Sequence, residues 1–141
     1  MEIGLISCTK SKRDDSAQPK DLYMESPLFR KARAYTERVH DDWYVLSAKH
    51  HLLDPDGPPI DPYEETLTTA TVDQRREWAQ TVFDQLSTNG LLKPDTTLVI
   101  HAGKAYYEPL LPLLKDEPVS IEVPTEGLQI GNTLAWYNDH Q

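Results

Sequence analysis

The segment "TTLVIHA", residues 96–102, decides the fold, because it is the most clearly strand-like stretch of the chain. A short aliphatic run that follows polar residues is typical of a buried strand. Gly103 comes next, and we expect a helix from there to about Leu114, made irregular by Pro109 and Pro112. The segment predicts a strand followed directly by a helix, which is the building unit of parallel sheets.

Three further strands are expected, at residues 2–8, 43–48 and 119–123. Helical patterns alternate with these strands along the chain. This alternation predicts an α/β fold, namely a three-layer α/β/α domain with a mostly parallel four-stranded sheet. No internal repeat or composition change divides the sequence, so residues 1–141 are expected to form a single domain.

The helix starts carry recognisable capping signals. Ser26 before Pro27 is typical of a helix start, and the helix is expected to run over residues 27–40. Thr71 and Gln74 form the spacing of a capping box, and that helix should end at Asn89-Gly90. The sequence "IGNTLAWYNDH" predicts a last short helix. Residues 49–69 are rich in Pro, Gly and Asp and are expected to form a long functional loop.

The charge of the chain is unevenly distributed. The net charge is −9, yet residues 1–50 carry nine lysines and arginines against eight carboxylates, whereas residues 51–141 carry five against fifteen. An acidic surface argues against non-specific duplex binding, so an anionic ligand would need a local basic site in the first 50 residues. No apolar stretch reaches the length of a membrane helix and no signal-peptide pattern is present, which predicts a cytoplasmic protein without membrane association.

Three loops should meet at one edge of the sheet. Residues 7–13, 47–66 and 101–107 each follow a predicted strand, and the carboxyl ends of parallel strands share an edge. Ligands of open α/β sheets collect at that edge. The convergence predicts that the functional site is built from these loops.

The first loop has the composition of an anion site. Its candidate ligand-binding residues are Ser7, Thr9, Lys10 and Lys12. Hydroxyl groups, ammonium groups and backbone amides after a strand could hold a phosphate or carboxylate, although the glycines of a Walker A loop are absent. A solvated basic loop is the equally weighted alternative. Cys8, the single cysteine, is read as a packing residue rather than a nucleophile.

The second loop supplies candidates for proton transfer and base stacking. Lys49 adds a cation, and His50 could act as acid or base. Tyr63 could stack on a base, and Glu64 is a candidate general base. The alternative is that the histidines are ordinary surface residues. No metal site is expected, because neighbouring histidines point to different sides. In the third loop, Gly103 allows close backbone approach at a helix N-terminus, although a structural turn would also explain it.

Several motifs together resemble an uncharacterised bacterial and archaeal domain family. The motifs are "LISCTKSK", "DLY-x2-SPLF", "LSAKHHLLDP", "PYEETL", "HAGKAYY" and "EGLQIGNTLAWY", and the resemblance extends from about Leu5 to Tyr137. The family pattern usually has Gly at the position of His51. More distantly, the motif order is similar to YaaA-type peroxide-stress proteins and to a domain of archaeosine synthase. Those relatives imply a fold like that of uracil-DNA glycosylases and a role near nucleic acids or modified bases.

The resemblance selects residues within the loops chosen on physical grounds. It points to Ser7, Lys10, Lys12, Asp21, Tyr23, Lys49, His50, Tyr63 and Gly103. The resulting expectation is a protein that processes a nucleotide, nucleoside or modified base at a glycosidic or phosphate-linked bond. Its catalytic residues would be His50, Asp21 and Glu64, and no cofactor is expected. The ligand would be a phosphate-bearing small molecule or single-stranded nucleic acid.

Two other interpretations remain open. One is a binding module without catalysis, for nucleotides or single-stranded nucleic acid, in a stress response. The other is a stress or scaffold protein that works through its acidic face. The C-terminal "LAWY" segment is expected to cover the sheet, with a homodimer contact as the alternative.

Overall fold

The computed structural model describes residues 1–141 and shows a mixed α/β fold. The sheet consists of β1 (Glu2–Ser7), β2 (Asp42–Ser47), β3 (His51–Leu53), β4 (Thr97–His101) and β5 (Ser120–Glu122). The helices are α1 (Pro19–Leu22), α2 (Pro27–Val39), α3 (Val72–Thr88), α4 (Lys104–Leu114) and α5 (Ile130–Asp139), with a short 3₁₀ turn at Leu67–Thr69. None of the helices is long and apolar enough to cross a membrane.

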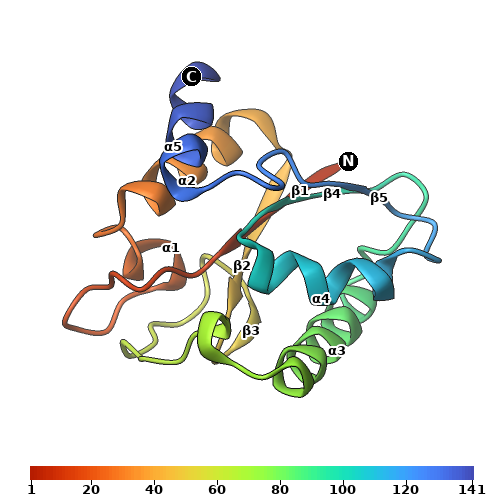
Figure 1. The fold of residues 1–141 in the computed structure, drawn as a ribbon, viewed down its shortest axis with the longest axis horizontal. Coiled ribbons are helices and arrows are strands. Elements are labelled where there is room, and N and C mark those ends of the chain that lie inside the picture. Colours follow the sequence, from red (N-terminus) through yellow and green to blue (C-terminus); the bar gives the residue numbers. More distant parts are fainter.

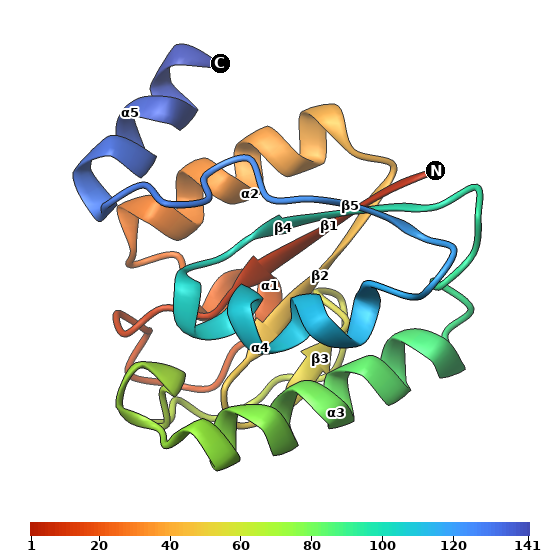
Figure 2. The ribbon, with the colours of Figure 1, turned by 45° about the vertical axis from the view of Figure 1, so that its right-hand side comes forward.

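The sheet has the strand order β3-β2-β1-β4-β5, and all neighbours are parallel except β2 and β3. Helices α2 and α5 lie on one face of the sheet, and α3 and α4 lie on the other (Figures 1 and 2). Ser7 pairs with Leu46, and Ile6 pairs with His101, so β1, β2 and β4 end side by side. The layered α/β arrangement and the shared carboxyl edge agree with the sequence-based expectation.

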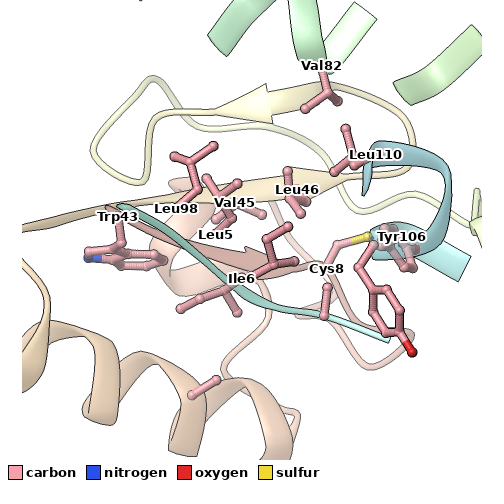
Figure 3. Packing of buried hydrophobic residues seen from close by; sticks show 14 of the residues in the cluster. Leu5, Ile6, Cys8, Trp43, Val45, Leu46, Val82, Leu98, Tyr106 and Leu110 are labelled. Carbon is pink, nitrogen blue, oxygen red and sulfur yellow. Dashed lines mark hydrogen bonds between the residues drawn. The ribbon is translucent and has the colours of Figure 1, made fainter. Parts of the chain in front are cut away.

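The core is built from the alternating side chains of the central strands. In Figure 3, Val82 and Leu110 lie on the side of α3 and α4, where they face Leu46. Trp43 lies toward α2, where its ring centroid is 6.3 Å from that of Phe29. Because both faces of the central strands are covered, these strands read as nearly continuous apolar runs in the sequence.

The capping signals operate as predicted. The Ser26 side chain accepts a hydrogen bond from the backbone N–H of Phe29 at 3.2 Å. Thr71 Oγ1 accepts from Gln74 N at 3.1 Å, and Gln74 Oε1 accepts from Thr71 N at 2.9 Å, which completes the capping box. Gly90 has a φ of +72°, so the left-handed residue that ends α3 is a glycine, as expected.

One sequence expectation needs correction. The sheet has five strands rather than four, because the chain reverses after β2 and residues expected to be loop form the antiparallel strand β3. Leu52 N also donates to Gln85 Oε1 at 2.9 Å, so α3 helps to hold β3. Helix α4 runs without interruption through Pro109 and Pro112. The carbonyls that lose their partners belong to Ala105 and Glu108, neither of which is buried.

The turn between β2 and β3 depends on a left-handed residue. His51 has a φ of +64°, in the region that favours glycine. His51 therefore holds a backbone conformation that glycine adopts without strain. We expect His51→Gly to be more stable than His51→Ala by about 1 kcal/mol, because only Gly adopts this φ without strain. Urea denaturation of both variants measures the difference; equal stabilities would contradict it.

Candidate functional site

A cavity of about 520 Å³ opens at the carboxyl edge of the sheet, between the ends of β1 and β4. The chain leaves β1 toward α2 on one face and leaves β4 toward α4 on the other, so this is the point at which the strand order reverses (Figure 2). Such a switch point is where open α/β sheets bind their ligands. The volume lies in the range of small-molecule sites.

The lining of the cavity is cationic and hydroxyl-rich, although the protein is acidic. Lys10 and Lys104 line it, and no aspartate or glutamate does. The serine and threonine residues of the lining are Ser7, Thr9, Ser11, Ser26, Thr125 and Thr133. Leu28, Phe29 and Tyr107 supply an apolar wall. This combination suits a ligand with an anionic group and an apolar or aromatic part.

Helix N-termini add backbone donors to the lining. Gly103 is the N-cap of α4 and Gln129 is the N-cap of α5, and neither helix start is capped by a side chain. Residues of both first turns, Lys104 and Ile130, line the cavity. Backbone N–H groups and the helix dipole at such ends favour negative charge.

Cys8 marks the point where the three predicted loops meet. Its backbone N–H donates to Leu46 O at 2.8 Å, and its Sγ accepts from Ala48 N at 3.4 Å. The hydroxyl of Tyr106, in the first turn of α4, lies 3.4 Å from the same sulfur. Cys8 is buried, as expected for a packing residue. The loops after β1, β2 and β4 therefore do come together at one edge.

A cluster of buried tyrosines lies beside the cavity and does not line it. The Tyr63 hydroxyl is 2.5 Å from the Tyr23 hydroxyl and 2.7 Å from Ser47 Oγ, which also accepts from His50 N at 2.9 Å. Burial raises the pKa of both tyrosines, so both hydroxyls stay protonated. Tyr63 is buried and lies outside the cavity lining, so its stacking role stays a prediction.

Lys12 and His50 belong to this tyrosine cluster. Lys12 Nζ lies 4.6 Å from the centroid of the Tyr63 ring and 5.9 Å from that of Tyr23, which is cation–π geometry. Burial lowers the pKa of Lys12. The His50 ring meets Tyr63 edge-on at 5.5 Å, and burial together with Lys49 lowers the pKa of His50. Neither residue lines the cavity.

The expected catalytic carboxylates also lie away from the cavity. Asp21 Oδ1 accepts from Arg33 Nη1 at 3.3 Å, so the aspartate is ion-paired on the surface. Glu64 and Lys49 are exposed. Of the residues selected from the sequence, the structure brings Ser7, Thr9, Lys10 and Gly103 together around the cavity. His50, Asp21 and Glu64 do not reach it.

A buried polar chain that the sequence did not reveal leads away from the cavity wall. Tyr137 and His101 line the cavity, and the Tyr137 hydroxyl lies 2.8 Å from His101 Nδ1. His101 Nε2 lies 2.9 Å from His40 Nε2, and His40 Nδ1 lies 2.8 Å from Glu2 Oε1. Burial, with a further contribution from His40, lowers the pKa of His101 to about 3. The chain joins four elements: α5, β4, the end of α2 and β1.

The sequence held only one signal for this chain. His101 stands at the end of the strongest strand, at the edge where ligands are expected. Its partners come from the end of one helix, the last turn of another and the first residue of a strand. No local spacing connects them, because their contacts arise only when α2 and α5 pack together on the sheet.

Comparisons with known proteins identify the family of the chain. A search of curated proteins and a search of solved structures found no match. The resemblance to YaaA-type proteins and archaeosine synthase therefore rests on the motifs alone. One sequence profile, described as a family of unknown function, matches residues 3–139. Because the match covers nearly the whole sequence, the chain belongs to the family of unknown function DUF6884.

Proposed function

We propose that the protein processes a nucleotide, nucleoside or modified base, at a glycosidic or phosphate-linked bond, in the cavity between β1 and β4. One observation carries the proposal: an acidic protein keeps this cavity free of carboxylates and places two lysines in its lining. The motif resemblance to YaaA-type proteins and to archaeosine synthase points to the same ligand class.

Different residues of the cavity wall suit the phosphate and the base or sugar of such a ligand. Lys10, the hydroxyls of Ser7 and Thr9, and the start of α4 would hold a phosphate. The exposed side chains of Leu128 and Ile130, which also line the cavity, would contact the apolar part of a base or sugar. This assignment keeps the phosphate at the first loop and moves the base from Tyr63 in the second loop to the space between the first and third loops.

A thermal-shift screen followed by mass spectrometry tests the proposal. The panel contains nucleosides, nucleoside 5′-monophosphates and 7-deazaguanine bases. At 100 times its Kd, a ligand adds about 2.7 kcal/mol to the stability. For a domain of this size, that is a rise in melting temperature of roughly 5–10 °C. We expect at least one panel member to shift the protein and to be converted to a product. No shift by any member would overturn the proposal, and a shift without product would favour the binding module instead.

Lys10→Ala is expected to weaken the binding of a nucleoside 5′-monophosphate about 10- to 100-fold, because it removes one charge-assisted contact to phosphate. Lys10 is exposed, so the melting temperature without ligand should stay nearly unchanged. Lys49→Ala is the matched control, since it removes the same charge from an exposed residue that does not line the cavity. A larger loss of affinity for Lys49→Ala, measured by isothermal calorimetry, would place the phosphate elsewhere.

A further inference from the structure

The buried chain from Tyr137 to Glu2 has a single consistent arrangement of protons. A carboxylate only accepts, so His40 carries a proton on Nδ1 and donates it to Glu2. Only one proton fits between the two Nε2 atoms at 2.9 Å. When His40 is neutral, that proton belongs to His101. The Nδ1 of His101 is then an acceptor, and the Tyr137 hydroxyl donates to it. Every donor in the chain points away from the cavity.

We propose that Tyr137, His101, His40 and Glu2 form a proton relay that takes a proton from a ligand or water in the cavity and stores it beside Glu2. Tyr137 is the member that would touch the ligand: it lines the cavity and is the terminal member of the chain, whereas both ring nitrogens of His101, which also lines the cavity, are already hydrogen-bonded within the chain. His101, His40 and Glu2 would act through it. The relay depends on the proposed function in one respect only: the proposed ligand is the molecule that supplies the proton.

The transfer balances at each atom. A group X–H in the cavity gives its proton to the Tyr137 oxygen while the tyrosine proton moves to His101 Nδ1. The proton on His101 Nε2 moves at the same time to His40 Nε2. The result is X⁻ in the cavity, a neutral tyrosine, a neutral His101 of the other tautomer and a His40 imidazolium paired with the Glu2 carboxylate. The reverse movement returns the proton to a leaving group.

The environments of the members explain where the charge comes to rest. Burial and the neighbouring His40 lower the pKa of His101 to about 3, so the His101 imidazole is neutral at neutral pH. Burial also raises the pKa of Tyr137, so the residue is a phenol before and after the transfer. His40 is the member in contact with a carboxylate. The Glu2 side chain is 45 % exposed, which brings the far end of the chain to solvent.

Two of the groups around His40 are hydrogen-bonded to its ring, and the others only pack nearby. Glu2 from β1 and His101 from β4 bond to its two ring nitrogens. Tyr35 from α2 packs edge-on against both imidazoles, at 5.6 Å from His40 and 5.5 Å from His101. Asp41 accepts from the backbone N–H of Glu2 at 2.8 Å, and Arg38 lies over the Tyr35 ring at 5.7 Å. Glu2 is the only carboxylate bonded to the relay histidines.

Nitrogen-15 NMR of the histidine side chains tests the proton path without any ligand. We expect His101 to carry its proton on Nε2 near pH 8. As acid turns His40 into an imidazolium, His101 should switch to the Nδ1–H tautomer at the same midpoint while staying neutral. A His101 that keeps its Nε2 proton through the transition, or that titrates at a separate midpoint, would overturn the relay.

Three conservative variants sharpen the test. Glu2→Gln should move the shared transition to lower pH, because the imidazolium loses its carboxylate partner. Tyr137→Phe should also move it to lower pH, because the new Nδ1 proton of His101 would have no acceptor. Tyr35→Phe keeps the ring and has no hydrogen bond to the chain, so its transition should not move. A shift for Tyr35→Phe as large as that for Glu2→Gln would contradict the assignment.

Turnover measurements connect the relay with the cavity. With a panel member that the protein converts, Tyr137→Phe and Glu2→Gln should lower kcat about 10²-fold or more with little change in KM, since general-base catalysis is typically 10²–10⁴-fold. Tyr35→Phe should keep kcat. If His40 and His101 share one NMR transition but Tyr137→Phe and Glu2→Gln both keep the wild-type kcat, the relay has no catalytic role. A missing turnover in the wild type, with the coupled transitions present, would instead count against the proposed function.

Discussion

Replacing Tyr63 with alanine is expected to lower the free energy of unfolding by about 3–5 kcal/mol, the usual cost of deleting a buried aromatic ring. The side chain is only 6 % exposed, and its ring meets Tyr23 edge-on at 6.4 Å. Its hydroxyl also holds the Tyr23 hydroxyl and Ser47 Oγ together. Guanidinium denaturation measures the loss. Wild-type stability combined with a loss of nucleotide binding would instead restore the stacking role that the sequence suggested.

Tyr63→Phe separates the hydroxyl from the ring. This variant keeps the packing but leaves Tyr23 and Ser47 without their shared partner. We expect a loss of about 1–3 kcal/mol, which is the cost of leaving a buried polar group unsatisfied. The affinity for a nucleoside 5′-monophosphate should be retained, because Tyr63 does not line the cavity. A loss of stability as large as that of Tyr63→Ala would mean that the hydroxyl, rather than the ring, dominates.

Gly4→Ala is expected to destabilise the protein by about 1–3 kcal/mol, the usual cost of overpacking a core. A methyl group at this position in β1 would lie 2.6 Å from Thr36 Cγ2 and 3.0 Å from His40 Cδ2. Since β1 is the central strand and α2 lies directly on it, neither element can move without disturbing the sheet. Thermal denaturation provides the measurement, and an unchanged melting temperature would contradict the prediction.

A second substitution identifies the clash. Thr36→Ser removes the closest methyl group, so Gly4→Ala should cost less in the Thr36→Ser background than in the wild type. The single variant Thr36→Ser is the control. Thr36 Oγ1 is buried without a hydrogen-bond partner, and serine keeps this hydroxyl. The control therefore measures the loss of the methyl group and not the loss of a hydrogen bond. Additive effects of the two substitutions would place the strain at His40 instead.

Features with a local cause could be predicted from the sequence. The capping box at Thr71 and the glycine that ends α3 are determined by residues three or four positions apart. The meeting of three loops at one edge follows from the parallel strands, because chain direction alone places their ends together. The position of Lys10 at that edge could be predicted for the same reason, because this lysine follows the end of β1.

Features that depend on packing could not be predicted. Strand β3 begins with His51 in a left-handed conformation, which the residue type does not specify. Residue type also suggested Tyr63 as an exposed stacking group, whereas tertiary contacts bury it. His40 carries no motif, and it gains a role only because α2 places it between Glu2 and His101.

The two edge strands affect how the protein behaves when it is concentrated. β3 and β5 have three residues each, whereas the strands between them have five or six. Pro55 follows β3, and Pro118 and Pro124 flank β5. Because proline cannot donate a ladder hydrogen bond, each unpaired edge is short and bordered by residues that stop its extension. The sheet therefore gives another chain little backbone on which to add a strand, which protects the protein from edge-to-edge aggregation.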